Sequence, residues 1–317
     1  MPKLDTPIPE ARAIERWLRT VDGFAAAKVV EVGLAEGGVS NITCRVGLEG
    51  ARWGAIGLKL ERERGIFEPY DVIREGRVLR ALGATAIPVP EVLALGEDAS
   101  VLGARFVAME WIDAPHMGVA GPGGDFGAFV AMVATIHGTA WRGLLDGILP
   151  LPSGAEESIG WEIAAVARRI RALGTAEALL VEAGEALAKR IPADGELRLC
   201  QGDINVFNFL FRAREVVAVV DWEQARIGDA RSDIGQLLAL SHLKGAAWGP
   251  AGLSGMALAY GAAAGAELRG LEFFRAFWLW QLAVIHRGWV ALNGSEPWYT
   301  WEEVTGLLGT ALAETAG

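Results

Sequence analysis

The strongest indication of the fold is the stretch Cys200-Gln-Gly-Asp-Ile-Asn-Val-Phe-Asn-Phe-Leu-Phe211, followed by Val216-Val-Ala-Val-Val-Asp-Trp-Glu223. Its apolar runs are short and bounded by turn residues, a pattern that predicts strands joined by loops. Asp203 lies on the first loop, Asn208 follows five positions later, and Asp221 ends the second apolar run. The stretch therefore predicts two carboxylates and one amide brought together at strand ends.

This set of side chains matches the needs of phosphoryl transfer. The reaction needs a carboxylate that orients the attacking hydroxyl and accepts its proton, together with oxygen ligands for Mg²⁺. Asp203, Asn208 and Asp221 offer such groups. Each of them, taken alone, is explained as well by a turn or a cap as by chemistry. Their combination within one segment favours a phosphotransferase.

The segment resembles the signature of the aminoglycoside phosphotransferase and choline kinase-like family. That signature reads His-Gly-Asp, then Asn five residues after the Asp, then Asp-Trp-Glu-x-Ala at a strand end. The chain continues Ile227-Gly-Asp-Ala-Arg-Ser-Asp233, like the family's Gly-Asp-Pro stretch and the Asp that opens the next helix. The resemblance covers most of the chain, from about Val30 to Leu292, and is strongest to the branch related to the kinase-like domain of acyl-CoA dehydrogenase fusion proteins. It implies one role for each of four residues: Asp203 as catalytic base, Asn208 and Asp221 as metal ligands, and Asp233 as a support for the loop.

The chain departs from the family pattern at Gln201, where the family usually has His. Such a His mainly holds the loop through hydrogen bonds, and a Gln amide can also donate and accept, with a different reach. The change therefore concerns loop geometry and rate, not metal binding. It is the one residue that favours the alternative function, a nucleotide-binding pseudokinase that regulates a partner. A protein kinase is disfavoured, because no Gly stands at the third position of the Asp221 motif and no long activation segment follows.

The nucleotide side of the predicted site lies nearer the N-terminus. Paired glycines in Ala35-Glu-Gly-Gly-Val-Ser-Asn41 let backbone N–H groups approach phosphates closely, although a Gly-Gly between strands is usually just a hairpin turn. The stretch resembles the family's phosphate-covering turn. The resemblance implies nucleotide contacts by four residues of this turn: Gly37, Gly38, Ser40 and Asn41.

A buried ion pair is predicted between Lys59 and Glu75. Lys59 ends an expected strand, and Glu75 falls on the apolar stripe of the next expected helix with Val72 and Leu79. A carboxylate on an apolar stripe needs a cationic partner, because an unpaired buried charge is costly. The resemblance implies the same pair, with the lysine also holding the α- and β-phosphates. It further implies that Glu110 and Ile112, at the end of the last small-lobe strand, contact the base by main-chain groups.

The order of expected elements predicts an α+β, protein-kinase-like two-lobe fold. Strands at 28–32, 42–48, 55–60, 91–95 and 105–111 and helices at 11–20 and 69–82 form a small β-rich lobe, residues 1–112, which binds the nucleotide. Residues 113–317 form a mainly helical lobe with the catalytic loop, one embedded hairpin and the acceptor site, and the nucleotide cleft is expected between the lobes. The expected helices of this second lobe are 126–139, 158–173, 175–190, 232–243, 253–264, 271–292 and 302–313.

Composition limits the partners and the location. The 317 residues carry a formal net charge of -10, which argues against a nucleic-acid partner. The two cysteines are far apart and the N-terminus resembles no secretory signal, so a cytoplasmic protein is expected. The longest apolar stretch, Ala276–Ile285, is too short to span a bilayer, so no membrane contact is expected. The predicted cofactors are Mg²⁺ and ATP or GTP, and the predicted partner is a small hydroxylated substrate whose identity, whether thioester, amino alcohol or sugar, stays open.

Overall fold

The computed structural model describes residues 7–35, 41–66, 70–117, 126–174, 177–244, 249–265 and 268–315. The chain folds into two compact units, Met1–Asp113 and Ala114–Gly317. Each unit is described by itself below.

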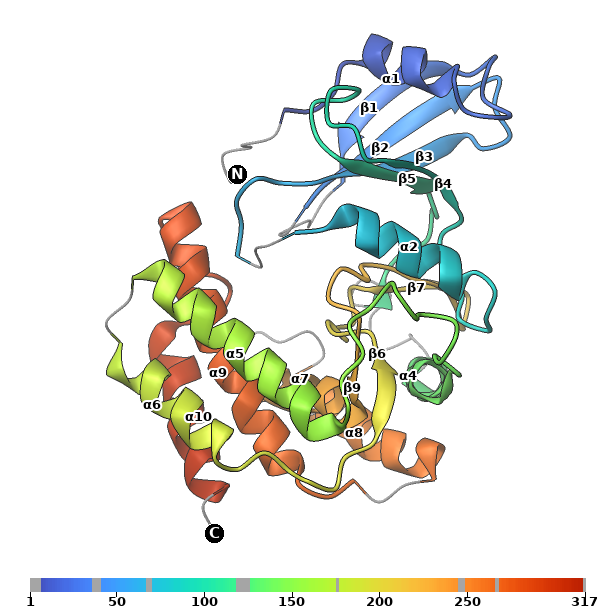
Figure 1. Cartoon of the computed structure of the whole chain (residues 1–317). Helices are drawn as coiled ribbons and strands as arrows, with labels where there is room; N and C mark the ends of the chain where they lie inside the picture. Colours follow the sequence, from blue (N-terminus) through green and yellow to red (C-terminus); the bar gives the residue numbers. More distant parts are fainter. Residues whose placement is uncertain are drawn as a thin grey trace. The chain divides into compact units, whose positions relative to one another are not determined.

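Unit 1 is built on a five-stranded antiparallel sheet with two helices (Figure 1). The strand order is β1-β2-β3-β5-β4, so that β3 and β5 lie inside the sheet. The elements are α1 (Ala11–Leu18), β1 (Lys28–Leu34), β2 (Ile42–Glu49), β3 (Ala55–Leu60), α2 (Val72–Leu82), β4 (Val92–Gly96) and β5 (Phe106–Glu110).

The two faces of this sheet are covered by different helices. Side chains alternate between faces along a strand. Leu58 and Phe106 therefore share a face and pack in one core cluster with residues of α1. Val107, directly opposite Lys59 across β3 and β5, lies on the other face and packs with residues of α2. Every residue of β3 is consequently buried.

Helix α2 approaches the sheet closely. A Cβ placed on Gly76 would lie 2.3 Å from Leu95 and 2.9 Å from Val107, so a larger residue would force these two side chains to shift. The helix begins at Val72, after the Asp71 side chain caps it by accepting a hydrogen bond from the Arg74 amide at 3.1 Å. The expected start at Pro69 falls outside the described residues.

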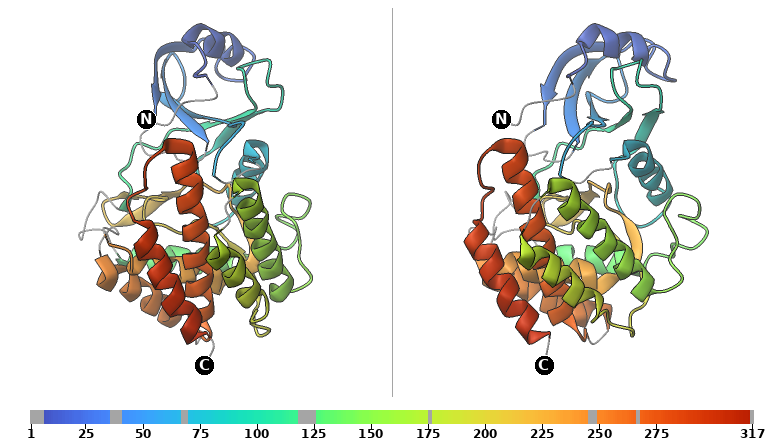
Figure 2. Two further views of the ribbon diagram at one scale, coloured as in Figure 1. Left: turned by 90° about the vertical axis from the view of Figure 1, so that its left-hand side faces the viewer. Right: turned by 60° about the vertical axis from the view of Figure 1, so that its left-hand side comes forward.

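Unit 2 consists mainly of helices, with short strands between α6 and α7. Figure 2 shows α9, the longest of them, beside α10, and α7 also packs along α9. Their contact faces form a large apolar core with α5 and α6. The elements are α4 (Phe126–Gly138), α5 (Ala155–Leu173), α6 (Ala178–Ala188), β6 (Leu197–Cys200), β7 (Phe209–Arg212), β8 (Glu215–Val219), β9 (Arg226–Asp229), α7 (Ala230–Ser241), α8 (Gly249–Ala264), α9 (Leu271–Asn293) and α10 (Trp301–Glu314).

The strands of unit 2 form two ribbons, not the single embedded hairpin that the sequence suggested. β7 pairs with β8 as expected, whereas β6 pairs with β9, from Leu197 opposite Asp229 to Cys200 opposite Arg226. β9 has the polar sequence Arg-Ile-Gly-Asp and lacks the apolar run that predicts a strand. The β6–β9 ribbon fixes both ends of the loop region that contains Asp203.

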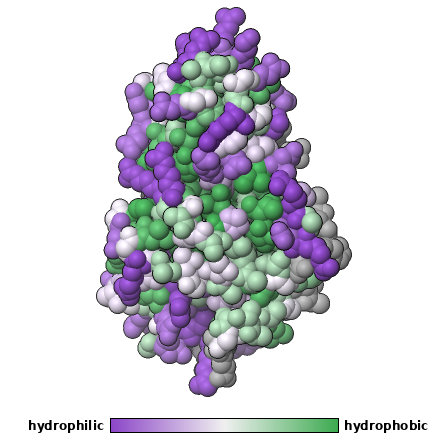
Figure 3. Space-filling view, turned by 90° about the vertical axis from the view of Figure 1, so that its right-hand side faces the viewer, coloured by the Kyte–Doolittle hydropathy of each residue, from purple (hydrophilic) through white to green (hydrophobic). Residues whose placement is uncertain are grey.

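Among the described residues, no helix is long and apolar enough to cross a membrane. On the face drawn in Figure 3, strongly hydrophilic side chains are interspersed with hydrophobic ones over unit 1. Exposed ion pairs such as Arg77 with Glu97, at 2.8 Å, contribute to the hydrophilic surface of this unit.

Candidate active site

The loop that carries Asp203 begins where β6 ends, at Cys200. Gly202 has a φ of +89°, in the left-handed region that favours glycine. A Cβ at this position would also lie 2.1 Å from the carbonyl oxygen of Gln224. The Gly of the Gln-Gly-Asp sequence is therefore required by both the turn and its close approach to the chain after β8.

Gln201 links the Asp203 loop to the segment that contains Asp221. Its side-chain Oε1 accepts a hydrogen bond from the Asp203 amide at 2.8 Å. Its Nε2 donates to the carbonyl oxygen of Asp221 at 2.7 Å and to that of Val220 at 3.2 Å. The fully buried side chain thus ties the Asp203 loop to the end of β8, which is the loop-holding role expected for this position.

Both carboxylate oxygens of Asp203 accept hydrogen bonds from side-chain amides. Gln236 Nε2 donates to Oδ1 at 2.7 Å, and Asn208 Nδ2 donates to Oδ2 at 3.1 Å. The Asn208 amide also donates to the Asp203 carbonyl oxygen at 2.8 Å. Gln236 was missed in the sequence, although its place one turn after Asp233, on the same helix face, was a usable signal.

Asp221 lies just beyond β8 in an unusual backbone conformation. Its φ is +59°, in the left-handed region that Asp tolerates better than most non-glycine residues. The Val220 amide donates to the Asn208 carbonyl oxygen at 2.9 Å, which extends the β7–β8 pairing by one step. Asn208 and Asp221 consequently lie at the same end of this ribbon, as the sequence predicted.

The electrostatic surroundings of Asp203 favour proton uptake. Burial raises the pKa of Asp203, and the negative charge of Asp221 raises it further. The amide hydrogen bonds from Gln236, Asn205 and Asn208 act in the opposite direction. A carboxylate with a raised pKa is a better proton acceptor, which is the property required of a general base.

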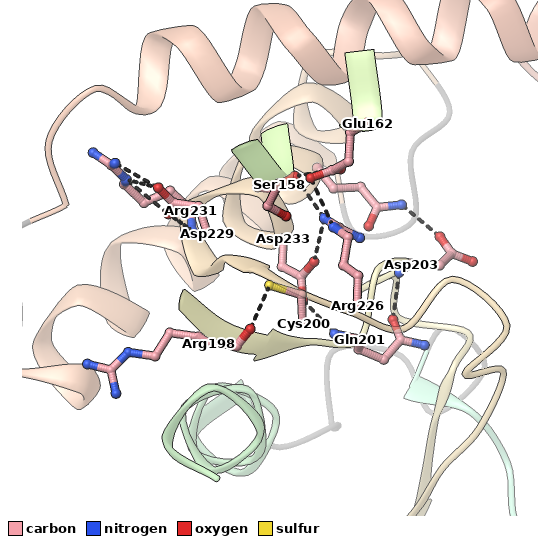
Figure 4. A network of polar contacts seen from close by, with 12 residues as sticks. Ser158, Glu162, Arg198, Cys200, Gln201, Asp203, Arg226, Asp229, Arg231 and Asp233 are labelled. Atoms are coloured by element: carbon pink, nitrogen blue, oxygen red, sulfur yellow. Dashed lines mark hydrogen bonds and ion pairs between the residues drawn. The ribbon is translucent and has the colours of Figure 1, made fainter. Parts of the chain in front are cut away.

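An ionic cluster built around the buried Asp233 contacts the loop at the Gln201 amide (Figure 4). Asp233, at the start of α7, accepts from the Gln201 amide at 2.9 Å and lies 3.3 Å from Arg226. Arg226 in turn pairs with Glu162 at 3.1 Å. Burial by itself raises the pKa of Asp233, but the His137 hydrogen bond and the Arg226 charge outweigh it, so this pKa lies below its ordinary value.

The cluster includes one group of possible metal ligands. His137, Cys200 and Asp233 each place one ligand atom within 4.8 Å of the other two. Asp233 already accepts hydrogen bonds from Gln201 and from Arg226, and His137 Nδ1 lies 2.8 Å from the Tyr260 hydroxyl. These contacts identify a satisfied hydrogen-bond network, and burial raises the pKa of the Cys200 thiol well above its ordinary value.

In unit 1, Lys59 and Glu75 form the buried ion pair that the sequence predicted. Lys59 Nζ lies 3.0 Å from Oε1 and 2.7 Å from Oε2 of Glu75. The two side chains are only 6% and 1% exposed, so the pair is not a solvated surface contact. The lysine is held in one orientation by both carboxylate oxygens.

The other predicted nucleotide contacts are described in part. Gly37, Gly38 and Ser40 fall outside the described residues. Asn41 is buried, and its side-chain oxygen accepts from the Arg62 amide at 3.2 Å, which indicates an anchor for the end of β3. The Glu110 amide donates to the Glu91 carbonyl at 2.8 Å, so a contact from Glu110 to a base is left to its carbonyl oxygen. Ile112 follows β5 in an irregular segment and is half-buried.

The donor set at the end of the β7–β8 ribbon fits a magnesium ion. Because the Asn208 nitrogen donates to Asp203, the amide oxygen is the atom of this side chain that can act as a ligand. The other candidate, Asp221, offers a carboxylate. Mg²⁺ prefers such oxygen ligands and usually keeps several waters, so two protein ligands are a sufficient set.

The two-unit α+β architecture and the Asp203 segment are those expected of a kinase-like phosphotransferase, and comparison with known proteins agrees. The model of the "Phosphotransferase enzyme family" matches residues 31–277, and the chain belongs to this family. The expected kinase-like α+β fold is confirmed by a solved structure, a putative aminoglycoside phosphotransferase from Ralstonia eutropha JMP134. The two superpose with a TM-score of 0.73 at 21% identity, over 97% of this chain and 98% of the other.

A second similar structure is aminoglycoside phosphotransferase APH(4)-Ia in ternary complex with ADP and hygromycin B. Its TM-score is 0.65 at 15% identity, with 96% of this chain and 99% of the other covered. Among curated proteins, the chain is 25% identical over 242 residues to acyl-CoA dehydrogenase family member 10 from Mus musculus, covering 70% of this chain. It is 27% identical over 178 residues to family member 11 from Homo sapiens, covering 52% of this chain. The matched parts span 21% and 22% of these relatives, about a fifth of their length.

Proposed function

We propose that this protein is a Mg²⁺-dependent kinase that transfers the γ-phosphate of ATP to a hydroxyl group of a small molecule. The observation that carries the proposal is the Asp203 carboxylate, which accepts one amide hydrogen bond at each oxygen. It belongs to the same loop and ribbon as Asn208 and Asp221. Membership in the phosphotransferase family supports the class of reaction.

In the proposed reaction, Asp203 orients the hydroxyl group of the acceptor and takes its proton as the oxygen attacks the γ-phosphorus. The bond between the γ-phosphorus and the β,γ-bridging oxygen breaks, and ADP leaves. Asn208 and Asp221 would hold the magnesium ion, which neutralises charge on the phosphate oxygens when it is bound. Burial raises the pKa of Asp203, which supports its role as base.

Unit 1 would supply the contacts to the nucleotide. A buried lysine held by a carboxylate at 2.7 Å has a fixed orientation, and Lys59 is proposed to contact the α- and β-phosphates. Gly37, Gly38, Ser40 and Asn41 are proposed to cover the phosphates, and the main chain of Glu110 and Ile112 to contact the base. The ADP bound to APH(4)-Ia supports an adenine nucleotide for this chain.

The acceptor is proposed to be a hydroxylated small molecule, and the ternary complex of an APH(4)-Ia variant with ADP and hygromycin B supports a small molecule that binds together with the nucleotide. A strongly cationic acceptor would need several available carboxylates. Of the candidates in unit 2, Asp229 is held by three hydrogen bonds from the Arg231 guanidinium, and Asp233 is held by Arg226. Both carboxylates are therefore already paired within unit 2 and are not counted among the groups that would bind a cationic acceptor.

The test is ATP consumption with Mg²⁺ against a panel of sugars, amino alcohols, hydroxyacyl thioesters and aminoglycosides. We expect turnover with at least one acceptor, and a loss of at least about 100-fold in kcat for Asp203→Asn, because a positioned base contributes about 10²–10⁴-fold. The matched control is Asp146→Asn, at an exposed position of the same unit, which should retain the wild-type rate.

The outcome that contradicts the proposal is also defined. Stabilisation of the protein by Mg–ATP without turnover on any acceptor or on water would favour the nucleotide-binding pseudokinase. The contacts of Gln201 to Asp203 and Asp221 argue for the kinase, because they perform the loop-holding role whose absence would have supported a pseudokinase.

A further inference from the structure

Helix α7 contacts the catalytic loop at two points. Asp233, in its first turn, accepts a hydrogen bond from the Gln201 amide at 2.9 Å. Gln236, three residues later, donates to Asp203 Oδ1 at 2.7 Å. Residues three apart lie on the same face of a helix, so one helix face holds both the backbone of the loop and its carboxylate.

The position of α7 is itself tightly fixed. A Cβ on Gly235 would lie 2.5 Å from the Cβ and 2.7 Å from the backbone of Phe274, so α7 packs against α9 at a distance that only glycine permits. Arg231 Nη1 also donates to the Arg269 carbonyl oxygen at 2.9 Å, just before α9 begins. A side chain on this part of α7 therefore has a well-defined place from which to contact Asp203.

Gln236 is buried, and its side-chain nitrogen donates a hydrogen bond to Asp203. Its exposed fraction is 4%, and among the described residues its Oε1 is a buried atom without a hydrogen-bond partner. Leaving a buried acceptor unpaired is costly, so packing alone would favour an apolar side chain here. The reverse amide orientation would place Oε1 against the carboxylate. The observed orientation therefore serves the contact to Asp203.

We propose that Gln236 is a positioning residue that holds the Asp203 carboxylate in the orientation needed to take the proton of the acceptor hydroxyl. The proposal rests on the kinase function proposed above. Gln236 and Asn208 hold one carboxylate oxygen each, from two different elements, and so fix the plane of the carboxylate. Both are neutral amides, which orient the base without supplying the full positive charge that would weaken it as a proton acceptor.

The test compares two variants of buried glutamines in the same unit. Gln236→Met keeps the length and volume of the side chain but removes the donor. Gln281→Met is the matched control, because Gln281 is 7% exposed and, among the described residues, its Nε2 has no hydrogen-bond partner. The readout is phosphate release from Mg–ATP with water as the acceptor, together with the affinity for Mg–ADP and crystal structures of both variants.

We expect kcat of Gln236→Met to fall about 10- to 100-fold, because small displacements of a catalytic group cost up to about 10²-fold. The KM for ATP and the affinity for Mg–ADP should stay within about twofold in both variants. The Gln281→Met control should keep the wild-type kcat. A wild-type kcat in Gln236→Met, or an equal loss in both variants, would overturn the proposal, since packing alone would then explain the residue.

The crystal structures keep this test separate from that of the kinase function. If wild-type protein neither binds nor hydrolyses ATP, the proposed function fails, and the orientation of Asp203 still decides the present inference. We expect a changed Asp203 rotamer in Gln236→Met and an unchanged one in Gln281→Met. An unchanged Asp203 in Gln236→Met would overturn the positioning role whatever the activity.

Discussion

Replacing Gln201 by methionine should destabilise unit 2, because this side chain satisfies three partly buried backbone groups. It accepts from the Asp203 amide and donates to the carbonyl oxygens of Val220 and Asp221. Gln201→Met keeps the length of the side chain and leaves these partners without it. A buried polar group left unpaired costs about 1–3 kcal/mol, and the lower figure applies to each of these partly buried groups, so we expect a loss of about 3 kcal/mol in the free energy of unfolding.

Calorimetry and urea unfolding measure this loss. For a unit of about 200 residues, 1 kcal/mol shifts Tm by about 2–4 °C, so a decrease of about 6–12 °C is expected. Gln281→Met again provides the control, because Gln281 Nε2 has no hydrogen-bond partner among the described residues and the substitution therefore breaks no hydrogen bond of this atom. The Tm of Gln281→Met should stay at or above that of wild type. A decrease in the Tm of Gln201→Met no larger than that of the control would show that Gln201 does not link the loop to the strand end.

Two further perturbations test the buried charges. Lys59→Met removes the cation that lies 2.7 Å from the buried Glu75 carboxylate and should cost about 3–5 kcal/mol in urea unfolding, whereas the double variant with Glu75→Gln should recover most of it; a single variant as stable as wild type would contradict the burial of the pair. Asp233→Asn tests the pH dependence of stability. The pKa of Asp233 is lowered in the folded protein, so the ionised carboxylate stabilises the fold at pH values above the ordinary value of 3.8. This stabilisation is lost as the pH falls through the lower folded-state pKa. The difference in Tm between wild type and Asp233→Asn should therefore be constant near neutral pH and shrink below about pH 3.8, and a difference that grows with acidity would be contrary to the sign of this shift.

The parts of the site that were predictable have local signals in the sequence. The spacing of Asp203 and Asn208 within one loop, and an acidic residue on an apolar helix stripe, both follow from short-range periodicity. The ion pair of Lys59 with Glu75 was predicted because a carboxylate on an apolar helix stripe needs a cationic partner, and Lys59 ends the preceding apolar strand. All expected helices are present among the described residues, with ends shifted by a few positions.

The parts that were missed depend on contacts distant in sequence. β9 pairs with β6 about 30 residues away and has a polar sequence without alternation, so its strand character comes from its partner. The contact from Gln236 to Asp203 spans 33 residues and depends on how closely α7 packs on α9. Arg226 and Glu162, 64 positions apart, form an ion pair that no local pattern indicates.

The departure at position 201 can now be understood from the atoms that the position must satisfy. It has to accept one hydrogen bond, from the Asp203 amide, and donate to the carbonyl oxygens that end β8. A neutral imidazole offers one acceptor and one donor, whereas the Gln201 amide offers an acceptor and two N–H groups, and here both carbonyls receive one. An imidazole also loses its acceptor when it is protonated near pH 6.5, which an amide does not. Glutamine therefore retains the link between the loop and the strand end over the whole pH range in which Asp203 can act as a base.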